Sequence, residues 1–181
     1  MVGVDDIRAG RWSFALAVLL VVAACDSPPA AGTSDASDRA SAASNSQLQL
    51  KVVTGGDLPD EPDRIVALGP NVVETVFALG AGERVVAVTK FADHPERATE
   101  LPSVGSYVQP DFESIVSREP DLVVGVTSGG DPEIADKLEA AGVPFAFVEM
   151  STFEQTRAAI RRIGEWIGRP DRADELVGRI D

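Results

Sequence analysis

Short apolar runs alternate with helix-like patterns along the chain from residue 47 onward. Four of these runs consist almost entirely of apolar residues, which is typical of strands buried on both faces of a sheet: 64–68, 85–89, 122–126 and 144–148. A further segment, 47–54, predicts an edge strand. The pattern therefore predicts five strands with longer connections between them.

The connections carry the start and stop signals of helices. Asn71, with Glu74 three residues on, predicts a capping-box-like helix start, and this helix ends at Gly80. Asp111 predicts the cap of a short helix that ends before Pro120.

Three more helices follow in the last third of the chain. Asp131-Pro132 predicts a helix start, because proline suits the first helical position. Apolar residues at 153, 160, 163 and 167 fall on one helical face, with Thr156 at the missing place. Asp171 predicts the cap of a last helix.

Apolar strands that alternate with helices predict an α/β domain: an open, mostly parallel sheet with helices on both faces. Ligands of such sheets bind beyond the carboxyl ends of the strands. The loops to inspect are therefore 69–71, 90–94, 105–110 and 127–131.

Two aromatic residues on these loops are candidates for ligand binding. Phe91 and Tyr107 are predicted to form an apolar wall, with Lys90 or Gln109 orienting a large ligand through polar contacts. The alternative is that Phe91 fills the edge of the core and that Tyr107 packs on a neighbouring loop. The sequence does not decide between the two.

Composition narrows the possible functions. The chain has 181 residues and a formal net charge of -13, so the usual electrostatic attraction to nucleic acid is absent. It contains one cysteine and one histidine, His94, which excludes an internal disulfide, a cysteine-built metal site and a multi-histidine metal site. We expect no bound metal and no resident cofactor.

Motifs of common enzymes do not occur where an α/β enzyme would carry them. No Gly-x-Gly-x-x-Gly, phosphate loop or Gly-x-Ser-x-Gly elbow follows a strand. The turn Gly69-Pro70-Asn71 is a poor phosphate cradle, because proline offers no N–H group. Asp93 and His94 are adjacent on a loop and rarely face each other in that arrangement. We therefore predict that the protein is not an enzyme.

The first 48 residues predict a secretion signal followed by a flexible tether. Residues 12–24 are uncharged and mainly apolar, too short to cross a bilayer, and preceded by Arg8 and Arg11, as in a secretory signal peptide spanning 1–24. The ending Val22-Ala23-Ala24-Cys25 resembles a bacterial lipobox, which implies that Cys25 is lipidated and anchors the protein to a membrane. The alternative is an incidental thiol. Residues 25–48 are predicted to be a disordered tether before the folded part, 49–181.

A series of motifs then occurs in order. They are RIVALGPNVVETVFALGAG (64–82), DHP (93–95), LPSVG (101–105), PDFESIV (110–116) and EPDLVV (119–124). This series resembles the cobalamin/iron-siderophore class of ABC-transporter substrate-binding proteins. The resemblance implies two α/β lobes joined by a long helix, with the ligand held between them. It also implies that this chain is truncated to the first lobe, ends in the start of the interlobe helix at Asp171, and binds ligand weakly when alone.

The resemblance implies roles for single residues. Phe91 and Tyr107 match aromatic positions that face the corrinoid in cobalamin-binding members, and Val126 stands where such members can place a further aromatic residue. Glu113 matches a glutamate that docks on arginines of the transporter's membrane subunit. Without the resemblance, Glu113 is a solvated carboxylate at a helix start.

Three functions remain from the sequence. The first is a lipid-anchored binding protein, in the periplasm or at the cell surface, that delivers cobalamin, a ferric siderophore or haem to an ABC importer. The second is a small flavodoxin-like enzyme, and the third is a structural lipoprotein domain without a ligand. Lys90 is the only obvious cation on the candidate loops, which mildly favours a neutral or cationic, partly apolar ligand such as a corrinoid.

Overall fold

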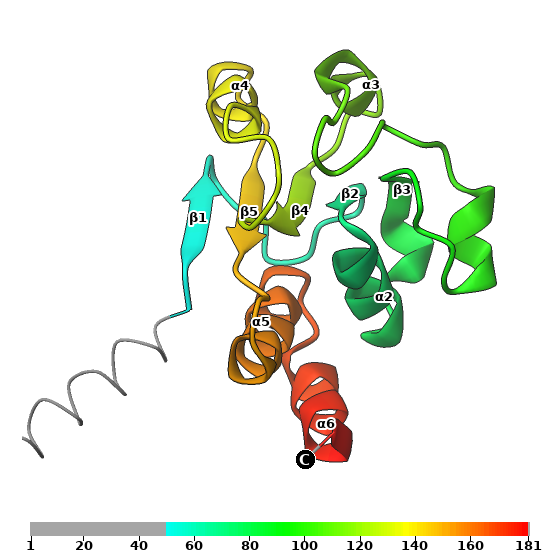
Figure 1. The fold of residues 1–181 in the computed structure, drawn as a ribbon, viewed down its shortest axis with the longest axis vertical. Coiled ribbons are helices and arrows are strands. Elements are labelled where there is room, and N and C mark those ends of the chain that lie inside the picture. Colours follow the sequence, from blue (N-terminus) through cyan, green and yellow to red (C-terminus); the bar gives the residue numbers. More distant parts are fainter. Residues whose placement is uncertain (1–49, 181) are drawn as a thin grey trace, which may run out of the picture.

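The computed structural model describes residues 50–180. It contains one five-stranded sheet between two layers of helices, with α3 and α4 on one face and α2, α5 and α6 on the other (Figure 1). The strands are β1 (Val52–Gly55), β2 (Ile65–Leu68), β3 (Val85–Val88), β4 (Leu122–Val126) and β5 (Phe145–Val148). The helices are α2 (Pro70–Ala78), α3 (Phe112–Val116), α4 (Ile134–Ala140), α5 (Phe153–Trp166) and α6 (Pro170–Ile180), with short 3-10 turns η1 (Gly82–Arg84) and η2 (Glu96–Glu100).

The sheet is open and mostly parallel, as predicted. Its strand order is β1-β5-β4-β2-β3, and β2, β3, β4 and β5 run parallel. The edge strand β1 is antiparallel to β5, with Val52 opposite Val148. The chain moves outward from β2 to β3 and then returns to the other side of β2 for β4. This reversal places a topological switch point between the carboxyl ends of β2 and β4, where open α/β sheets bind ligands.

Alternate residues of each central strand supply two separate cores. In β2, Ile65 and Ala67 pack toward α2, α5 and α6, whereas Val66 and Leu68 pack toward α3 and α4. All four are buried, which explains why the strands read as continuous apolar runs.

Three predicted helix starts differ from the observed starts by two residues each. α2 begins at Pro70 with Gly69 as its cap and no side-chain capping bond, so the Asn71–Glu74 capping pair does not form. The Asn71 side chain instead accepts a hydrogen bond from the next N–H group, at 3.1 Å. Proline at the first helical position explains the shift, because its missing N–H needs no partner there.

The other two starts are displaced for different reasons, and only α6 repeats the proline effect. Asp131 caps only a turn, in which its carboxylate accepts a hydrogen bond from Glu133 N at 2.9 Å, and α4 begins at Ile134. α6 begins at Pro170, so Asp171 lies inside its first turn rather than at its cap. In contrast, the Asp111 cap of α3 is confirmed, with Ser114 N donating to its carboxylate at 3.1 Å.

Helix α5 begins with a capping box that the sequence analysis missed. The Thr152 hydroxyl accepts from Gln155 N, and the Gln155 side chain accepts from Thr152 N, both at 3.1 Å. Ile160 and Ile163 are buried as predicted, but Phe153 is 58% exposed. The predicted apolar face of α5 therefore does not extend to its first residue.

The N-terminal predictions lie outside the described residues. The signal peptide 1–24, the lipidated Cys25 and the whole tether 25–48 belong to the part of the chain on which the structure gives no information. Within residues 50–180, none of the helices is both long and apolar enough to cross a membrane.

Candidate functional site at the carboxyl edge of the sheet

Four loops follow the parallel strands and meet at one edge of the sheet, which we call the carboxyl edge. They contain residues 69–71, 89–95, 127–131 and 149–152, and the segment 105–110 joins them. The buried Thr89 ties the loops after β2 and β3 together, because its hydroxyl accepts a hydrogen bond from Gly69 N at 3.1 Å. The Asn71 amide in turn donates to the Met150 sulfur at 3.6 Å, which connects the start of α2 to the end of β5.

Phe91 projects from this edge into solvent. Its side chain is 69% exposed, so it does not fill the edge of the core. Its backbone has a positive φ of 74°, a conformation that residues other than glycine rarely adopt. The loop is held on both sides by hydrogen bonds from Lys90 N to Gly105 O at 2.6 Å and from Ala92 N to Thr89 O at 3.2 Å. Strain of this kind persists only where the surroundings enforce it, and it is concentrated at functional sites.

Lys90 extends over the Phe91 ring. Its ammonium nitrogen lies 5.2 Å from the ring centroid, within the range of a cation–π contact. An exposed aromatic ring and a cation therefore lie together at these two neighbouring positions, and their contact with a ligand remains a prediction.

Tyr107 lies on a short loop closed by a bridge between Gly105 and Pro110. Its side chain is 36% exposed and lies over the 127–131 loop, where a Cβ atom on Gly129 would be 3.6 Å from the tyrosine ring. Tyr107 thus does pack on a neighbouring loop while it keeps an exposed surface. Gln109 is exposed, and its N–H donates to Ser106 Oγ at 3.0 Å.

The structure brings the predicted residues to one edge but not into one wall. Within residues 50–180 the aromatic ring pair in contact is Phe145–Phe147, with centroids 5.1 Å apart, so Phe91 and Tyr107 do not stack. Phe91 extends outward with Lys90, whereas Tyr107 faces the loop after β4.

A carboxylate at the end of β5 belongs to this edge and was missed. Glu149 accepts a hydrogen bond from Thr127 Oγ1 at 2.9 Å and another, short one from the Ser151 hydroxyl. Ser128 and Ser151 are also within hydrogen-bonding distance, at 3.4 Å. The Ser151 bond is the main cause that lowers the pKa of Glu149, with smaller contributions from Ser128, Thr127 and the charge of Lys51, while desolvation opposes them.

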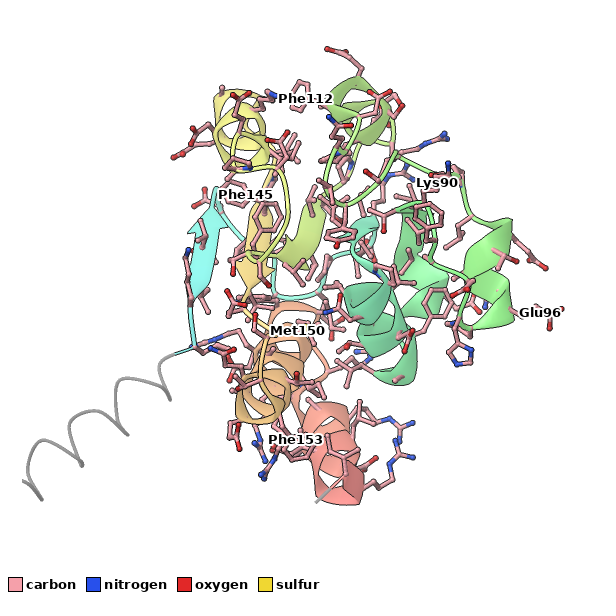
Figure 2. All side chains as sticks on the ribbon, in the orientation of Figure 1. Lys90, Glu96, Phe112, Phe145, Met150 and Phe153 are labelled. Atoms are coloured by element: carbon pink, nitrogen blue, oxygen red, sulfur yellow. The ribbon has the colours of Figure 1, made fainter. Side chains whose placement is uncertain are left out.

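The signal for Glu149 was present in the sequence. The rule that ligands bind beyond the strand ends applies equally to the fourth predicted strand, 144–148, whose following loop was not inspected. Figure 2 shows Met150 in this passage from β5 to α5, and Lys90 at a well-separated place. The edge is therefore broad, with a cation and an exposed aromatic ring on one part and an ionised carboxylate on another.

A pocket of about 220 Å³ opens at the switch point. Its lining combines the end of β4, Tyr107, the turn before α4 and part of β1. Val126, the position at which the resemblance leaves room for a further aromatic residue, forms part of the wall. Phe91 is not among the lining residues, so the pocket does not lie between Phe91 and Tyr107.

Glu113 lies in the first turn of α3, which follows the 105–110 segment. It is exposed, and the neighbouring Asp111 carboxylate caps the same helix. Hydrogen bonds from Ser114 hold the pKa of Asp111 below its usual range. Glu113 is thus accessible to a partner, and its docking role remains a prediction.

Acidic, histidine and cysteine side chains do not gather into a metal site in the part of the chain that the structure describes. His94 is exposed on the loop after β3. What the carboxyl edge offers is a set of binding groups: an apolar pocket, exposed aromatic surface, hydroxyl groups and one charge of each sign.

Comparisons with known proteins agree with this arrangement. The family model of periplasmic binding proteins matches residues 65–181. A vitamin B12-binding protein from Vibrio campbellii is 30% identical over 108 residues, which is 60% of this chain and 39% of that relative. The chain thus matches less than half the length of this relative.

Solved structures give the same result for the fold. A periplasmic haem-binding protein from Pseudomonas aeruginosa has a TM-score of 0.62 and 31% identity, covering 66% of this chain and 43% of that one. A periplasmic haem-binding protein from Roseiflexus sp. RS-1, in its apo form, has a TM-score of 0.61 and 36% identity, covering 65% and 46%.

The names of these relatives describe binding proteins rather than enzymes. They agree with the predicted non-enzymatic role and argue against a flavodoxin-like enzyme. The family match covers more than half of the chain and includes every strand of the parallel sheet. This chain belongs to the periplasmic binding protein family.

Proposed function

We propose that this chain is the N-terminal lobe of an ABC-importer substrate-binding lipoprotein that captures cobalamin, haem or a ferric siderophore. Its carboxyl edge forms one wall of the binding cleft, and a second lobe closes the other side. The observation that carries the proposal is Phe91, which a strained and well-anchored loop holds exposed at this edge. Flat, partly apolar ligands gain from such exposed aromatic surface.

Charge favours some of these ligands over others. Glu149 is held ionised at the edge by the hydroxyl groups of Thr127 and Ser151, and its charge would repel a carboxylate-rich ligand. Lys90 is the cation nearest to Phe91. This balance supports a neutral or cationic, partly apolar ligand, for which a corrinoid is the best candidate among the three classes.

The test is a titration of the protein with cyanocobalamin, haem and a ferric siderophore, followed by intrinsic fluorescence. Phe91→Ala and Tyr107→Ala should each weaken binding of the recognised ligand by about tenfold, because each removes a large apolar contact. Ile180→Ala, which truncates an exposed apolar residue at the end of α6, serves as the matched control and should leave affinity unchanged. Equal affinity in all variants would contradict the proposal.

We further propose that the protein works in the periplasm or at the cell surface, anchored to the membrane by acyl chains on Cys25. The support is the order of signal-like residues before Cys25 and the periplasmic origin named for the solved relatives. Replacing Cys25 with alanine should move the protein from the membrane fraction to the soluble fraction of cells. An unchanged membrane fraction would show that no lipid on Cys25 holds it.

Glu113 is proposed to dock on the permease of the importer. It is exposed in the first turn of α3. Glu113→Arg should reduce ligand uptake by cells while ligand affinity in solution stays the same. If uptake is unaffected, Glu113 is a solvated helix-start carboxylate only.

A further inference from the structure

The pocket at the switch point extends from the carboxyl edge into the layer between the sheet and α4. Its floor is the sheet face that carries Leu68, Gly125 and Phe147, and Val53 of β1 continues it. The start of α4 and the turn before it form one wall, and Tyr107, Thr127 and Lys51 complete the lining. The pocket is thus a side chamber of the edge described above, and Tyr107 is common to both.

Local structure keeps this chamber open. Gly125 is buried in β4, and a Cβ atom there would come within 3.0 Å of the Phe147 ring, so no side chain rises from this part of the floor. The wall residue Ala135 is also small. Because α4 begins only at Ile134, the preceding wall is an irregular turn that contains Asp131 and Pro132 rather than a packed helical turn.

Size and chemistry restrict what fits. The chamber holds about 220 Å³, and an apolar cavity of roughly 150 Å³ is large enough to bind benzene. Its deep side chains, Leu68, Ile134 and Phe147, are apolar and provide no partner for a buried polar group. Lys51 and Asp131 bring one charge of each sign to the lining, so the chamber has no net preference for an ion.

We propose that this chamber binds one uncharged, ring-sized apolar group, an aromatic ring or branched alkyl group that projects from the transported ligand. The inference rests on the proposed function, because it makes the chamber a specificity subsite of the same edge. A ligand without such a group leaves the chamber empty and loses the gain from burial, roughly fourfold in affinity for each methylene-sized unit.

The chamber itself is tested with benzene as the probe. Methyl NMR signals of Leu68, Val53 and Ile134 should shift when benzene is added to the full chain. Ala135→Leu places a larger side chain in the chamber and should abolish these shifts. Ala140→Leu is the matched control, since Ala140 is exposed on the same helix and is not a lining residue, and it should keep them. If Ala135→Leu does not fold, Val53→Phe fills the chamber from β1 instead, since Val53 is a lining residue opposite Phe147.

Two outcomes overturn the inference: no shift in the unaltered protein, or equal shifts in the filled variant. A second arm measures affinity for cyanocobalamin and haem. The filled variant should bind the recognised ligand at least tenfold more weakly than the Ala140→Leu control, and equal affinity would show that the ligand does not use the chamber. If cyanocobalamin, haem and a ferric siderophore all fail to bind the unaltered protein, the proposed function is contradicted, while the benzene arm still decides whether the chamber accepts an apolar ring.

Discussion

At the scale of single residues, the carboxyl edge combines strain with exposure. Phe91 has both a positive φ and a mostly exposed ring, a combination that folding alone does not favour. The residue type and its loop were predictable, because an aromatic residue follows an apolar strand. The backbone conformation was not, since it depends on the long-range bond from Lys90 N to Gly105 O.

Phe91→Asn should relieve this strain, because asparagine tolerates a left-handed backbone better than most residues. We expect the free energy of unfolding to stay the same or rise by up to about 1 kcal/mol, while ligand affinity falls. Urea unfolding monitored by circular dichroism provides the measurement. A loss of more than about 1 kcal/mol would mean that the Phe91 ring stabilises the fold, against the exposure described above.

Glu149 gives the edge a pH dependence. Hydrogen bonding lowers its pKa in the folded protein below the ordinary value of 4.5, so its ionised form stabilises the fold above that value. This contribution is lost as the pH falls below 4.5 and through the lowered pKa. Glu149→Gln should therefore lose less stability between about pH 7 and about pH 3.5 than the unaltered protein.

The control is Glu139→Gln, an exposed carboxylate on α4. This variant should keep the acid-induced loss of stability seen in the unaltered protein. Urea midpoints at the two pH values give the comparison, and an identical acid loss in Glu149→Gln would show that its hydrogen bonds contribute nothing to folding.

At the scale of elements, the sequence predicted strands better than helix starts. β4 occupies the predicted range, and β2, β3 and β5 differ from it by one residue at one end, because a strand buried on both faces has to be a continuous apolar run. Helix starts are set by competing local bonds, and proline at Pro70 and Pro170 takes the first helical position in place of the predicted caps. The capping box of α5 was readable from Thr152 and Gln155, yet the apolar pattern from Phe153 alone was used.

The α5–α6 contact depends on Gly164. A Cβ atom at this position would lie 2.5 Å from the Ala173 Cβ and 3.0 Å from the Arg169 carbonyl oxygen. Gly164→Ala should therefore destabilise the protein by about 1–3 kcal/mol through overpacking. Gly178→Ala in α6 meets no atom within 4 Å and should stabilise it by up to about 1 kcal/mol, as alanine favours a helix interior. Thermal unfolding of the two variants should shift in opposite directions, and equal shifts would contradict this packing.

At the scale of the whole molecule, the order of strands and the chemistry of their ends decide the function. The sheet order places a switch point between β2 and β4, and a pocket lies beside it. The alternation of strands and helices was enough to predict this edge. The position of Tyr107 over the 127–131 loop, the chamber beside it and the hydroxyl groups around Glu149 were not predictable, because they join segments that are distant along the chain.

The most direct test of this account is to map where a ligand contacts the protein. Amide NMR spectra are recorded while cyanocobalamin, gallium protoporphyrin or a gallium-loaded siderophore is added, since even weak binding by a single lobe shifts the signals. We predict that one of them shifts the amide signals of the loops 89–95, 105–110, 127–131 and 149–152. The signals of the turns that precede the parallel strands, at the opposite edge of the sheet, should stay unchanged. No shifts with any of the three, or shifts confined to surfaces away from these loops, would contradict the claim that the carboxyl edge is the binding wall.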